Sequence, residues 1–303
     1  MSYPATAIVL LNWNQTDLTL ACLRSLARLD YPEAKIILVD NGSAEDSLEP
    51  IESEFPGIVL IRNDRNLGYT GGNNIGICRA LADGSDCVML LNNDTEVAPD
   101  MLRVLVDVAE SDPSIGIVGP LILYYEDPTR IWSAGGAVDP RTADAVSLDE
   151  GELDDGRLAP TQVDYVSGCA LLVKRSVVEQ VGLLDERMFI YYEETDWCAR
   201  AREAGYQIQL VPQAKVWHKI SLQTRAVSRR YIYLMTRNRL LYLRNRSRSI
   251  PHILGIILLR DVRQVILWQL RPRYRDRRPM AIYKARGVVD YMRGRFGEPP
   301  FPP

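Results

Sequence analysis

The sequence is poor in the residues and motifs that define several common protein classes. It has two histidines in 303 residues, and its five cysteines are scattered with no CxxC pair. An odd, dispersed set of cysteines is typical of reduced thiols and predicts a cytoplasmic protein. No positively charged start precedes an apolar run, so the sequence also predicts no signal peptide.

Two nucleotide-binding fingerprints are missing as well. No GxxxxGK[ST] stretch occurs, which sets phosphate-hydrolysing P-loop enzymes aside. Gly68, Gly71 and Gly72 have the wrong spacing for GxGxxG, so an NAD-dependent enzyme is disfavoured and no dinucleotide binding is expected. These glycines fit either a plain loop before a helix or a close approach of the backbone to a ligand, with the helix N-terminus facing phosphate.

Charge is unevenly distributed along the chain, although the net charge is only −3. Residues 225–303 hold nineteen Arg and Lys against four acids, a net +15. The rest of the chain holds 17 basic and 35 acidic residues, a net −18. A basic segment after an acidic body suggests an anionic partner, either membrane phospholipid or nucleic acid.

The remaining composition, 47% hydrophobic and 25% charged residues, is ordinary for a soluble globular protein. Short apolar runs typical of buried strands alternate with segments whose apolar residues have helical spacing. This alternation predicts an α/β fold with a mostly parallel sheet. The predicted strands are residues 7–11, 35–39, 57–61, 87–91, 115–120, 165–173 and 211–217, and the main predicted helices are 17–29, 48–55, 99–110 and 195–204. The acidic segment 126–162, which is rich in Gly and Pro, is expected to be a mobile insertion.

One stretch carries the strongest chemical signal. The apolar residues 88–91 run directly into Asn92, Asn93 and Asp94. A strand buried on both faces places the residues after it at the carboxyl edge of the sheet, where ligands of open α/β folds bind. Mg²⁺ prefers oxygen ligands and often takes one or two carboxylates plus substrate phosphates, so Asp94 is predicted to bind a metal under a diphosphate. The alternative is a simple turn, because Asn-Asn-Asp-Thr is good turn and N-cap chemistry.

Polar residues follow four of the predicted strands, not one. A single polar cluster is a turn, but four at the same edge of a parallel sheet predict a polar cleft of nucleotide size. These residues are Asn12 and Asn14, Asp40 and Asn41, Asn63, and Asn92 with Asp94.

An acidic cluster lies further along the chain. Tyr191 and Tyr192 precede Glu193, Glu194 and Asp196, and a helix comes next. Acids in the first turn of a helix are favoured by its dipole, which is an adequate explanation for one of the three. The aromatic residues, including Trp197, fit either stacking on sugar faces or a place in the core. His218 closes a predicted edge strand, and a lone histidine is more often structural than catalytic.

Together these motifs resemble the family 2 glycosyltransferases of GT-A fold, in particular the bacterial rhamnosyltransferase-like branch that builds surface polysaccharides. The matching stretches occur in the family's order and cover residues 5–220. They are residues 11–14, 39–43, 66–74, 90–95, 164–172, 189–196 and 216–218.

The resemblance implies a role for individual residues. Asp94 looks like the last position of the family's metal-binding DxD motif, with Asn92 in place of the first Asp, and His218 resembles the histidine that completes the metal site. Glu194 aligns with the catalytic base, where many relatives have Asp. The residues implied in nucleotide-sugar binding are Asn12, Asn14, Asp40, Asn41, Asn63, Gly68, Gly71, Gly72, Asn73 and Asn93, and the acceptor-side candidates are Tyr191, Tyr192, Glu193, Asp196 and Trp197.

The implied reaction moves a sugar, rhamnose or similar, from a dTDP- or UDP-linked donor to a hydroxyl of a lipid-linked or polysaccharide acceptor in cell-surface glycan synthesis. Mg²⁺ or Mn²⁺ would stabilise the leaving diphosphate, and Glu194 would take the acceptor's proton. One base and no second nucleophile favour direct displacement with inversion. The alternative is a nucleotide-sugar-binding protein that has lost catalysis, which Asn92 and the Glu193–Glu194 pair keep open.

The domain prediction is a GT-A catalytic domain over residues 1–224, with a nucleotide-binding half to about 120 and an acceptor half after it, and a basic helical extension over 225–303. The apolar run 253–270 is broken by Arg260, Asp261 and Arg263, so it does not predict a membrane-spanning helix. It fits a basic amphipathic helix that lies on an anionic membrane, at the inner face of the plasma membrane. Nucleic acid is not expected as a partner. The alternative is a helical subdomain that covers the core, and a homodimer is left open.

Overall fold

The computed structural model describes residues 3–32, 34–43, 48–220, 228–247 and 249–301. The chain divides into two compact units, and each is described separately. The first comprises Met1–Ala137, Val146–Leu184 and Glu194–Thr224, and the second comprises Val138–Ala145, Asp185–Glu193 and Arg225–Pro303. The predicted boundary at residue 224 falls within 221–227, outside the described residues, and the proposed catalytic and extension domains stay a prediction.

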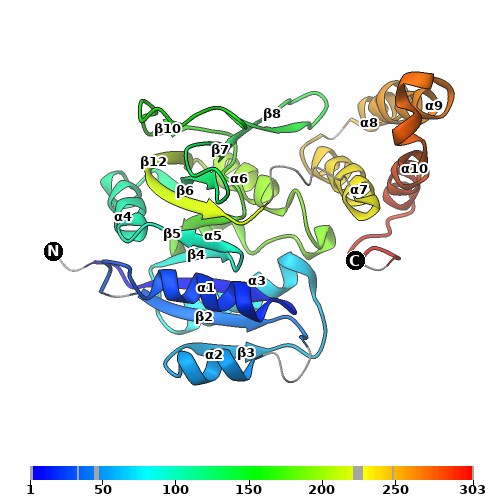
Figure 1. The fold of residues 1–303 in the computed structure, drawn as a ribbon. Helices are drawn as coiled ribbons and strands as arrows, with labels where there is room; N and C mark the ends of the chain where they lie inside the picture. Colours follow the sequence, from blue (N-terminus) through cyan, green and yellow to red (C-terminus); the bar gives the residue numbers. More distant parts are fainter. Residues whose placement is uncertain (1–2, 33, 44–47, 221–227, 248, 302–303) are drawn as a thin grey trace. The chain divides into compact units, whose positions relative to one another are not determined.

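A ten-stranded mixed sheet organises the first unit (Figure 1). Its path is β10-β12-β6-β11-β4-β1-β2-β3, with β5 paired to β12 and β7 to β6. Strands β3, β2, β1 and β4 are parallel, which confirms the predicted α/β class. The strands are β1 (Thr6–Asn12), β2 (Ala34–Asp40), β3 (Val59–Arg62), β4 (Cys87–Asn92), β5 (Thr95–Val97), β6 (Ile115–Tyr124), β7 (Ile131–Ser133), β10 (Thr161–Gln162), β11 (Ala170–Lys174) and β12 (Gln207–His218).

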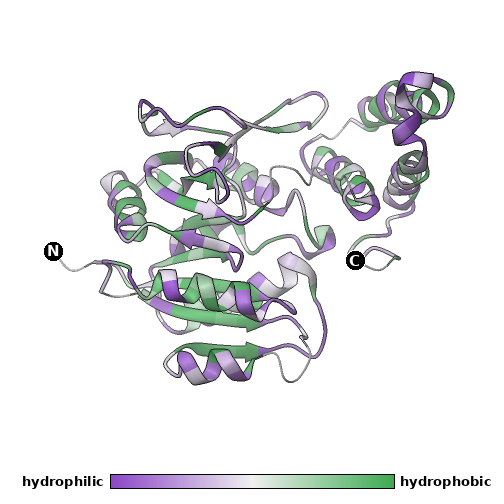
Figure 2. Ribbon diagram, in the orientation of Figure 1, coloured by the Kyte–Doolittle hydropathy of each residue, from purple (hydrophilic) through white to green (hydrophobic). Residues whose placement is uncertain are grey.

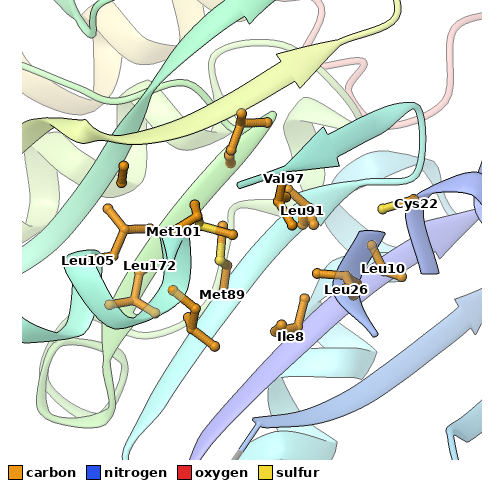
Figure 3. Packing of buried hydrophobic residues seen from close by; sticks show 14 of the residues in the cluster. Ile8, Leu10, Cys22, Leu26, Met89, Leu91, Val97, Met101, Leu105 and Leu172 are labelled. Atoms are coloured by element: carbon orange, nitrogen blue, oxygen red, sulfur yellow. The ribbon is translucent and has the colours of Figure 1, made fainter. Parts of the chain in front are cut away.

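The helices of the first unit cover the sheet on both faces. Side chains alternate along β1, so Ile8 and Leu10 join a core cluster with Cys22 and Leu26 (Figure 3). The odd positions of the same strand face α3 instead, as its glycine contacts show. The central strands are mostly hydrophobic (Figure 2). The helices are α1 (Thr16–Leu26), α2 (Glu49–Glu54), α3 (Gly68–Ala82), α4 (Met101–Ser111), α5 (Arg175–Val181) and α6 (Glu193–Glu203).

Two glycines let α3 pack directly onto the sheet. A Cβ atom on Gly72 would lie 2.3 Å from Cδ1 of Leu11, and one on Gly76 would lie 2.3 Å from Cγ1 of Val9. Real Cβ atoms do not approach so closely, so the side chains of β1 or the helix itself would have to shift. This packing sets the position of the helix that follows the polar end of β3.

The structure differs from the predicted elements at three places. Strand β12, predicted as an edge strand over residues 211–217, lies between β10 and β6 and also pairs with β5. Strand β11 is antiparallel to β4 and β6, and it begins at Ala170 because residues 166–169 run as a loop before it. A buried strand is apolar on both faces whichever way it runs, so composition does not reveal direction. The segment predicted to be a mobile insertion has regular structure: β7, β10 and the two-stranded sheet of β8 (Gly136–Val138) and β9 (Ala145–Ser147).

The second unit is a helical assembly. Helices α7 and α10 pack closely, because Gly287 approaches the carbonyl oxygen of Tyr233, and a Cβ there would lie 2.8 Å from it. In the part of the chain that the structure describes, no helix is long and apolar enough to cross a membrane. The helices are α7 (Arg229–Arg246), α8 (Ile250–Ile256), the π-helical turn η3 (Ile257–Val262), α9 (Arg263–Leu270), the 3-10 segment η4 (Pro272–Arg277) and α10 (Arg278–Met292).

Candidate active site

The carboxyl ends of the parallel strands bring the predicted polar residues together. In the register of the sheet, Asn12 at the end of β1 pairs with Asp40 at the end of β2, and Leu11 pairs with Asn92 at the end of β4. Asp40 in turn pairs with Arg62, directly before Asn63. The four clusters therefore share one edge of the sheet, as the alternation of strands and helices predicted.

Asp40 and Asn12 form the buried centre of this edge. The Asn12 Nδ2 group donates to Asp40 Oδ1 at 2.9 Å, and the backbone N–H of Ser43 donates to Asp40 Oδ2 at 3.0 Å. Asn12 accepts from Thr19 at 2.8 Å, and Asn93 donates to the same Thr19 hydroxyl at 2.9 Å. Both oxygens of the Asp40 carboxylate already accept bonds within the protein, so Asp40 also holds the loop after β2.

Asn41 links β2, β3 and the start of α3. Its Nδ2 group donates to Asn66 Oδ1 and to the carbonyl oxygen of Gly68, each at 3.0 Å. Its Oδ1 accepts from Asn63 Nδ2 at 3.1 Å and from the N–H of Leu67 at 3.0 Å. The amide therefore fixes the turn that leads into the helix N-terminus. Gly68 itself has a φ of +75°, a conformation that favours glycine.

The other predicted donor-side residues differ in exposure. Asn14 is exposed at the end of β1 with a φ of 54°, and its N–H donates to Ser43 Oγ at 2.8 Å. Asn73 is buried in α3 and donates to the carbonyl oxygen of Tyr69 at 2.9 Å. Gly71 and Gly72 serve helix packing in the structure, against Leu67 and Leu11 respectively. Their role in binding a donor stays a prediction.

Asp94 and His218 face each other at the same edge. Strand β5 pairs antiparallel with the end of β12, and Thr95 lies opposite His218. As a result, Asp94 Oδ1 lies 3.1 Å from His218 Nε2. Neither atom, nor His218 Nδ1, makes a geometrically sound hydrogen bond within the described residues. Burial opposes a charge on His218, but the nearby Cys169 and Asp94 outweigh it and raise the pKa of the imidazole.

Glu194 lies at the start of α6, beside the loop that precedes β11. A Cβ atom on Gly168 would lie 3.5 Å from the Glu194 Cβ and 3.2 Å from the Tyr69 hydroxyl. The next residue, Cys169, accepts a hydrogen bond from the N–H of Asn92 at 2.8 Å. Two consecutive residues therefore touch Glu194 on one side and the Asp94 motif on the other, which brings the predicted base close to the predicted metal ligands.

The carboxyl group of Glu194 is poorly hydrated. Its Oε2 atom is buried and has no hydrogen-bond partner among the described residues, although the residue as a whole is only partly buried. Loss of solvent raises the pKa of this carboxyl group from 4.5 to about 7, against the opposing effect of the backbone N–H groups of Glu194 and Thr195. Such a carboxylate is a competent proton acceptor near neutral pH.

Two acceptor-side candidates are structural. Trp197 has no exposed surface, and its Nε1 donates to the carbonyl oxygen of Gly182 at 2.8 Å. Asp196 is 1% exposed and accepts from Arg200 Nε at 2.8 Å. Their burial leaves no face for a sugar, so the acceptor-side interpretation does not fit these two residues.

The other acceptor-side candidates belong to the second unit, in a segment with unusual backbone geometry. Phe189, Tyr191 and Tyr192 have φ values of 66°, 72° and 73°. Non-glycine residues rarely adopt this conformation, which costs about 1–2 kcal/mol each. Tyr192 is buried and donates to the carbonyl oxygen of Ala143 at 2.9 Å, and Glu193 is 4% exposed. The strained segment ends directly before Glu194 in the chain.

Sequence reasoning missed the residue that holds this segment, Asn238 on α7. Asn238 has no exposed surface, and its Nδ2 group donates to the carbonyl oxygens of Met188, Ile190 and Tyr191 at 2.8, 2.9 and 2.8 Å. We call these contacts the Asn238 clamp. No pattern in the sequence singles out Asn238, because the polar residues 236–239 are buried by the fold and their residue types alone suit an exposed basic helix. The strong positive charge of the segment directed attention to its surface instead.

Comparison with known proteins gives a consistent result. The family model for glycosyl transferase family 2 matches residues 7–182. The chain is 30% identical over 223 residues to the N-acetylglucosaminyl-diphospho-decaprenol L-rhamnosyltransferase of Mycobacterium tuberculosis. The aligned region covers 65% of this chain and 70% of that protein.

Solved structures agree in fold. The structure of GalNAc-T7 with UDP, GalNAc and Mn²⁺ superposes with a TM-score of 0.61 at 18% identity, and the match covers 91% of this chain but only 58% of that one. The mannosyltransferase PcManGT from Pyrobaculum calidifontis, in complex with GDP-Man and Mn²⁺, gives a TM-score of 0.59 at 13% identity and covers 96% and 88% of the two chains. Identities this low carry the fold alone.

Proposed function

The chain belongs to glycosyl transferase family 2, and from that premise we propose that it transfers a hexose, rhamnose or similar, from a nucleotide-diphosphate donor to an acceptor hydroxyl with inversion. The observation that carries the proposal is the adjacency of the Asp94–His218 pair and the poorly hydrated Glu194, joined through Gly168 and Cys169. One base beside one cation site is the minimum that a direct displacement needs.

The donor set at this edge fits a divalent cation, Mg²⁺ or Mn²⁺. Asp94 Oδ1 and His218 Nε2, 3.1 Å apart, would hold it. A carboxylate oxygen and an imidazole nitrogen at this separation could contact the same cation, and both are ligands that such ions accept. The described residues contain no group of three His, Cys, Asp or Glu side chains around one point, so the donor's diphosphate would complete the coordination. When bound, the cation would neutralise charge on the leaving diphosphate.

Glu194 would act as the general base. Its carboxylate would accept the proton of the acceptor hydroxyl while the hydroxyl oxygen forms a bond to the anomeric carbon. The bond from that carbon to the diphosphate breaks, and its electron pair leaves with the diphosphate. The acceptor oxygen attacks the anomeric carbon directly, and no enzyme nucleophile takes part. The anomeric configuration therefore inverts. The donor-side residues would then be the polar ends of β1 to β4, with Asn14 as the exposed member.

A dTDP- or UDP-linked sugar is the proposed donor, and a lipid-linked or polysaccharide acceptor in cell-surface glycan synthesis is the proposed partner. The name of the M. tuberculosis relative supports a rhamnosyl donor and a sugar–diphospho–polyprenol acceptor. Such an acceptor lies in a membrane, so we also infer peripheral association with the inner face of the plasma membrane through the basic residues after 225.

A thermal-shift screen tests donor and metal together. The protein is heated with dTDP-, UDP- and GDP-sugars, each with and without MnCl₂. At a hundredfold excess over Kd, binding adds about 2.7 kcal/mol, which raises the Tm of a chain of this length by roughly 4 °C. We expect a metal-dependent shift with one nucleotide class, and its loss in Asp94→Ala.

The matched control is Asp107→Ala, which removes a carboxylate whose side chain is 54% exposed on α4. It should behave as the wild type. The proposal fails if no nucleotide sugar shifts the Tm with either metal, or if Asp94→Ala turns over a donor at the wild-type rate while folded.

A further inference from the structure

The segment from α8 through η3 to α9 has many aliphatic residues on the outside. Seven aliphatic side chains between residues 250 and 270 are 37–72% exposed, and hydrophobic colour persists along these helices (Figure 2). We call them the aliphatic stripe. Its members are Ile250, Leu254, Leu258, Leu259, Val262, Ile266 and Leu270.

The π-helical turn η3 gathers the stripe onto one side of the helix. Six of its members recur every fourth residue from 250 to 270. In a regular α-helix a residue four positions further along is rotated by about 40° around the helix axis. Five such steps would spread the six side chains over about 200° of the helix surface. A π-helix has more than four residues per turn, so a step of four residues within 257–262 falls short of a full turn and rotates the other way. This opposite rotation confines the stripe to roughly half of that arc. Single π-helical turns of this kind often occur at functional sites.

The opposite side of the same segment is held by buried charges. Asp261, with no exposed surface, forms ion pairs with Arg239 of α7 at 2.6 Å and Lys284 of α10 at 2.9 Å. Arg260 pairs with Asp144 in the same unit. The inner side of this segment thus combines the buried Ile253, Ile257 and Trp268 with the ion pairs of Asp261, and its outer side carries the exposed aliphatic residues. A large exposed apolar patch of this kind marks an interaction surface.

Cations lie beside the C-terminal part of the stripe. A hollow of about 340 Å³ beside it is lined by Arg260, Arg263 and Arg277 together with Leu259, Leu267, Gln264, Trp268 and Tyr274. The guanidinium of Arg277 lies 5.7 Å from the ring centre of Trp268, and that of Arg273 lies 4.7 Å from the ring centre of Tyr274. Further exposed arginines come directly after the stripe, at positions 271, 275 and 278.

We propose that the aliphatic stripe and its arginines form a surface that inserts into an anionic phospholipid bilayer. The leucines would enter the boundary of the acyl chains, and the arginine-lined hollow would hold a lipid phosphate. This inference deepens the proposed function, since it names the surface by which the enzyme reaches a lipid-linked acceptor. Interfacial helices combine these two features, an apolar face and a cationic border.

The charges favour a membrane over a second copy of the chain. A two-fold dimer through the stripe would bring the same arginines of both copies together, and like charges around an interface are unfavourable. An anionic leaflet instead complements them, and each cation near its surface strengthens binding about fivefold, from about 1 kcal/mol apiece. Insertion of the aliphatic side chains adds a contribution to the binding free energy that salt does not screen.

The test is co-sedimentation of the full chain with phosphatidylglycerol and with phosphatidylcholine vesicles at low and high salt. The stripe variant carries Leu254→Gln, Leu258→Gln and Leu270→Gln, and the arginine variant carries Arg263→Gln and Arg277→Gln. Because Gln is a good helix former and these positions are exposed, folding should be retained, which circular dichroism checks. The control for both is Val146→Gln with Leu153→Gln, two residues 55% and 58% exposed in the first unit.

We expect the wild type and the control to bind phosphatidylglycerol vesicles alike. The stripe variant should bind about thirtyfold more weakly or worse at every salt concentration, and the arginine variant about 25-fold more weakly at low salt only. Wild-type binding that is equal on both lipids, absent at low salt, or unaffected by the stripe variant overturns the inference. So does a wild-type dimer in sedimentation velocity that the stripe variant dissociates without any vesicle binding.

Donor hydrolysis separates this inference from the proposed function. All variants should hydrolyse a soluble donor at the wild-type rate, since none of the substituted residues lies at the candidate active site. Vesicle binding without donor hydrolysis would contradict the transferase proposal and leave the surface intact. Donor hydrolysis without vesicle binding would contradict the membrane surface and leave the transferase proposal intact.

Discussion

Replacement of Glu194 by Gln should abolish sugar transfer and at the same time make the protein more stable at neutral pH. The substitution keeps the shape of the side chain and removes its ability to accept a proton. It also removes a carboxyl group that must lose its proton in a poorly hydrated position, with Oε2 shielded from solvent. The two effects have one cause, because the burial that raises the pKa of Glu194 also makes its charged form unfavourable.

The magnitude comes from the pKa of about 7 in the folded protein and the ordinary value of 4.5. Below pH 4.5 the carboxyl is protonated in both the folded and the unfolded chain, so it has no pH-dependent effect. Between 4.5 and 7 the unfolded chain releases the proton first, and the wild type loses stability by about 1.36 kcal/mol per pH unit. Above pH 7 the loss is constant at about 3 kcal/mol at most.

The assay is urea unfolding of the wild type and Glu194→Gln at several pH values from 4.5 to 8, with Glu179→Gln as control. Glu179 is 60% exposed on α5, so its replacement should not change the pH profile. The stability of Glu194→Gln relative to the wild type should rise with pH and level off above 7. In the wild type, kcat/KM should rise tenfold per pH unit below about 7, as a free-enzyme base requires.

Two outcomes would refute this reasoning. A stability difference that stays constant across the pH range would mean that Glu194 is normally hydrated. Retained transfer in Glu194→Gln, with loss in Glu193→Gln or Asp196→Asn instead, would mean that another acid of the cluster is the base. Donor binding by Glu194→Gln should survive, which the metal-dependent thermal shift measures.

Three further predictions concern the metal ligand, the clamp and the packing of α3. Asp94→Ala should lower turnover about a hundredfold or more through lost charge stabilisation, measured against Asp107→Ala; equal rates in the two variants would contradict the role. Asn238→Ala should lose about 2–3 kcal/mol with the two N–H donors that its three carbonyl partners share, and lower kcat more than it changes the donor KM, and Asn238→Asp, which cannot donate to carbonyls, should be at least as impaired. Gly72→Ala should lose about 1–3 kcal/mol by overpacking against β1 in urea unfolding, whereas Gly57→Ala, with no atom within 4 Å, should not.

The sequence was informative wherever apolar periodicity and polar strand ends coincide. Ile8 to Leu10 and Val88 to Leu91 are buried on both faces, so their runs indicated the central strands and the edge at which Asp94 lies. Other properties leave no such trace. The direction of β11 depends on its pairing with β4, which is distant in the chain. The ion-pair partners of the buried Asp261 likewise lie 22 and 23 residues away from it in the sequence.

Burial of individual polar and aromatic residues was also beyond the reach of pattern reasoning. Trp197 and Asp196 stand beside Glu194 in a motif, yet the first fills the core and the second anchors Arg200. Asn238 lies among arginines and suggests part of a basic surface, but its amide points inward. Residue type gives the chemistry available, and only the fold decides which side chains face a ligand.

The Asn238 clamp restricts how this enzyme can be shortened or recombined with its relatives. The family match ends at residue 182, before Glu194 and His218, and the strained residues 189–192 group with the helical unit. A chimaera that exchanges the chain from about residue 225 onward would pair one parent's strained loop with the other parent's α7. Three carbonyl groups would then depend on a foreign side chain for their donor. A crossover near residue 184 instead keeps loop, base and clamp from a single parent.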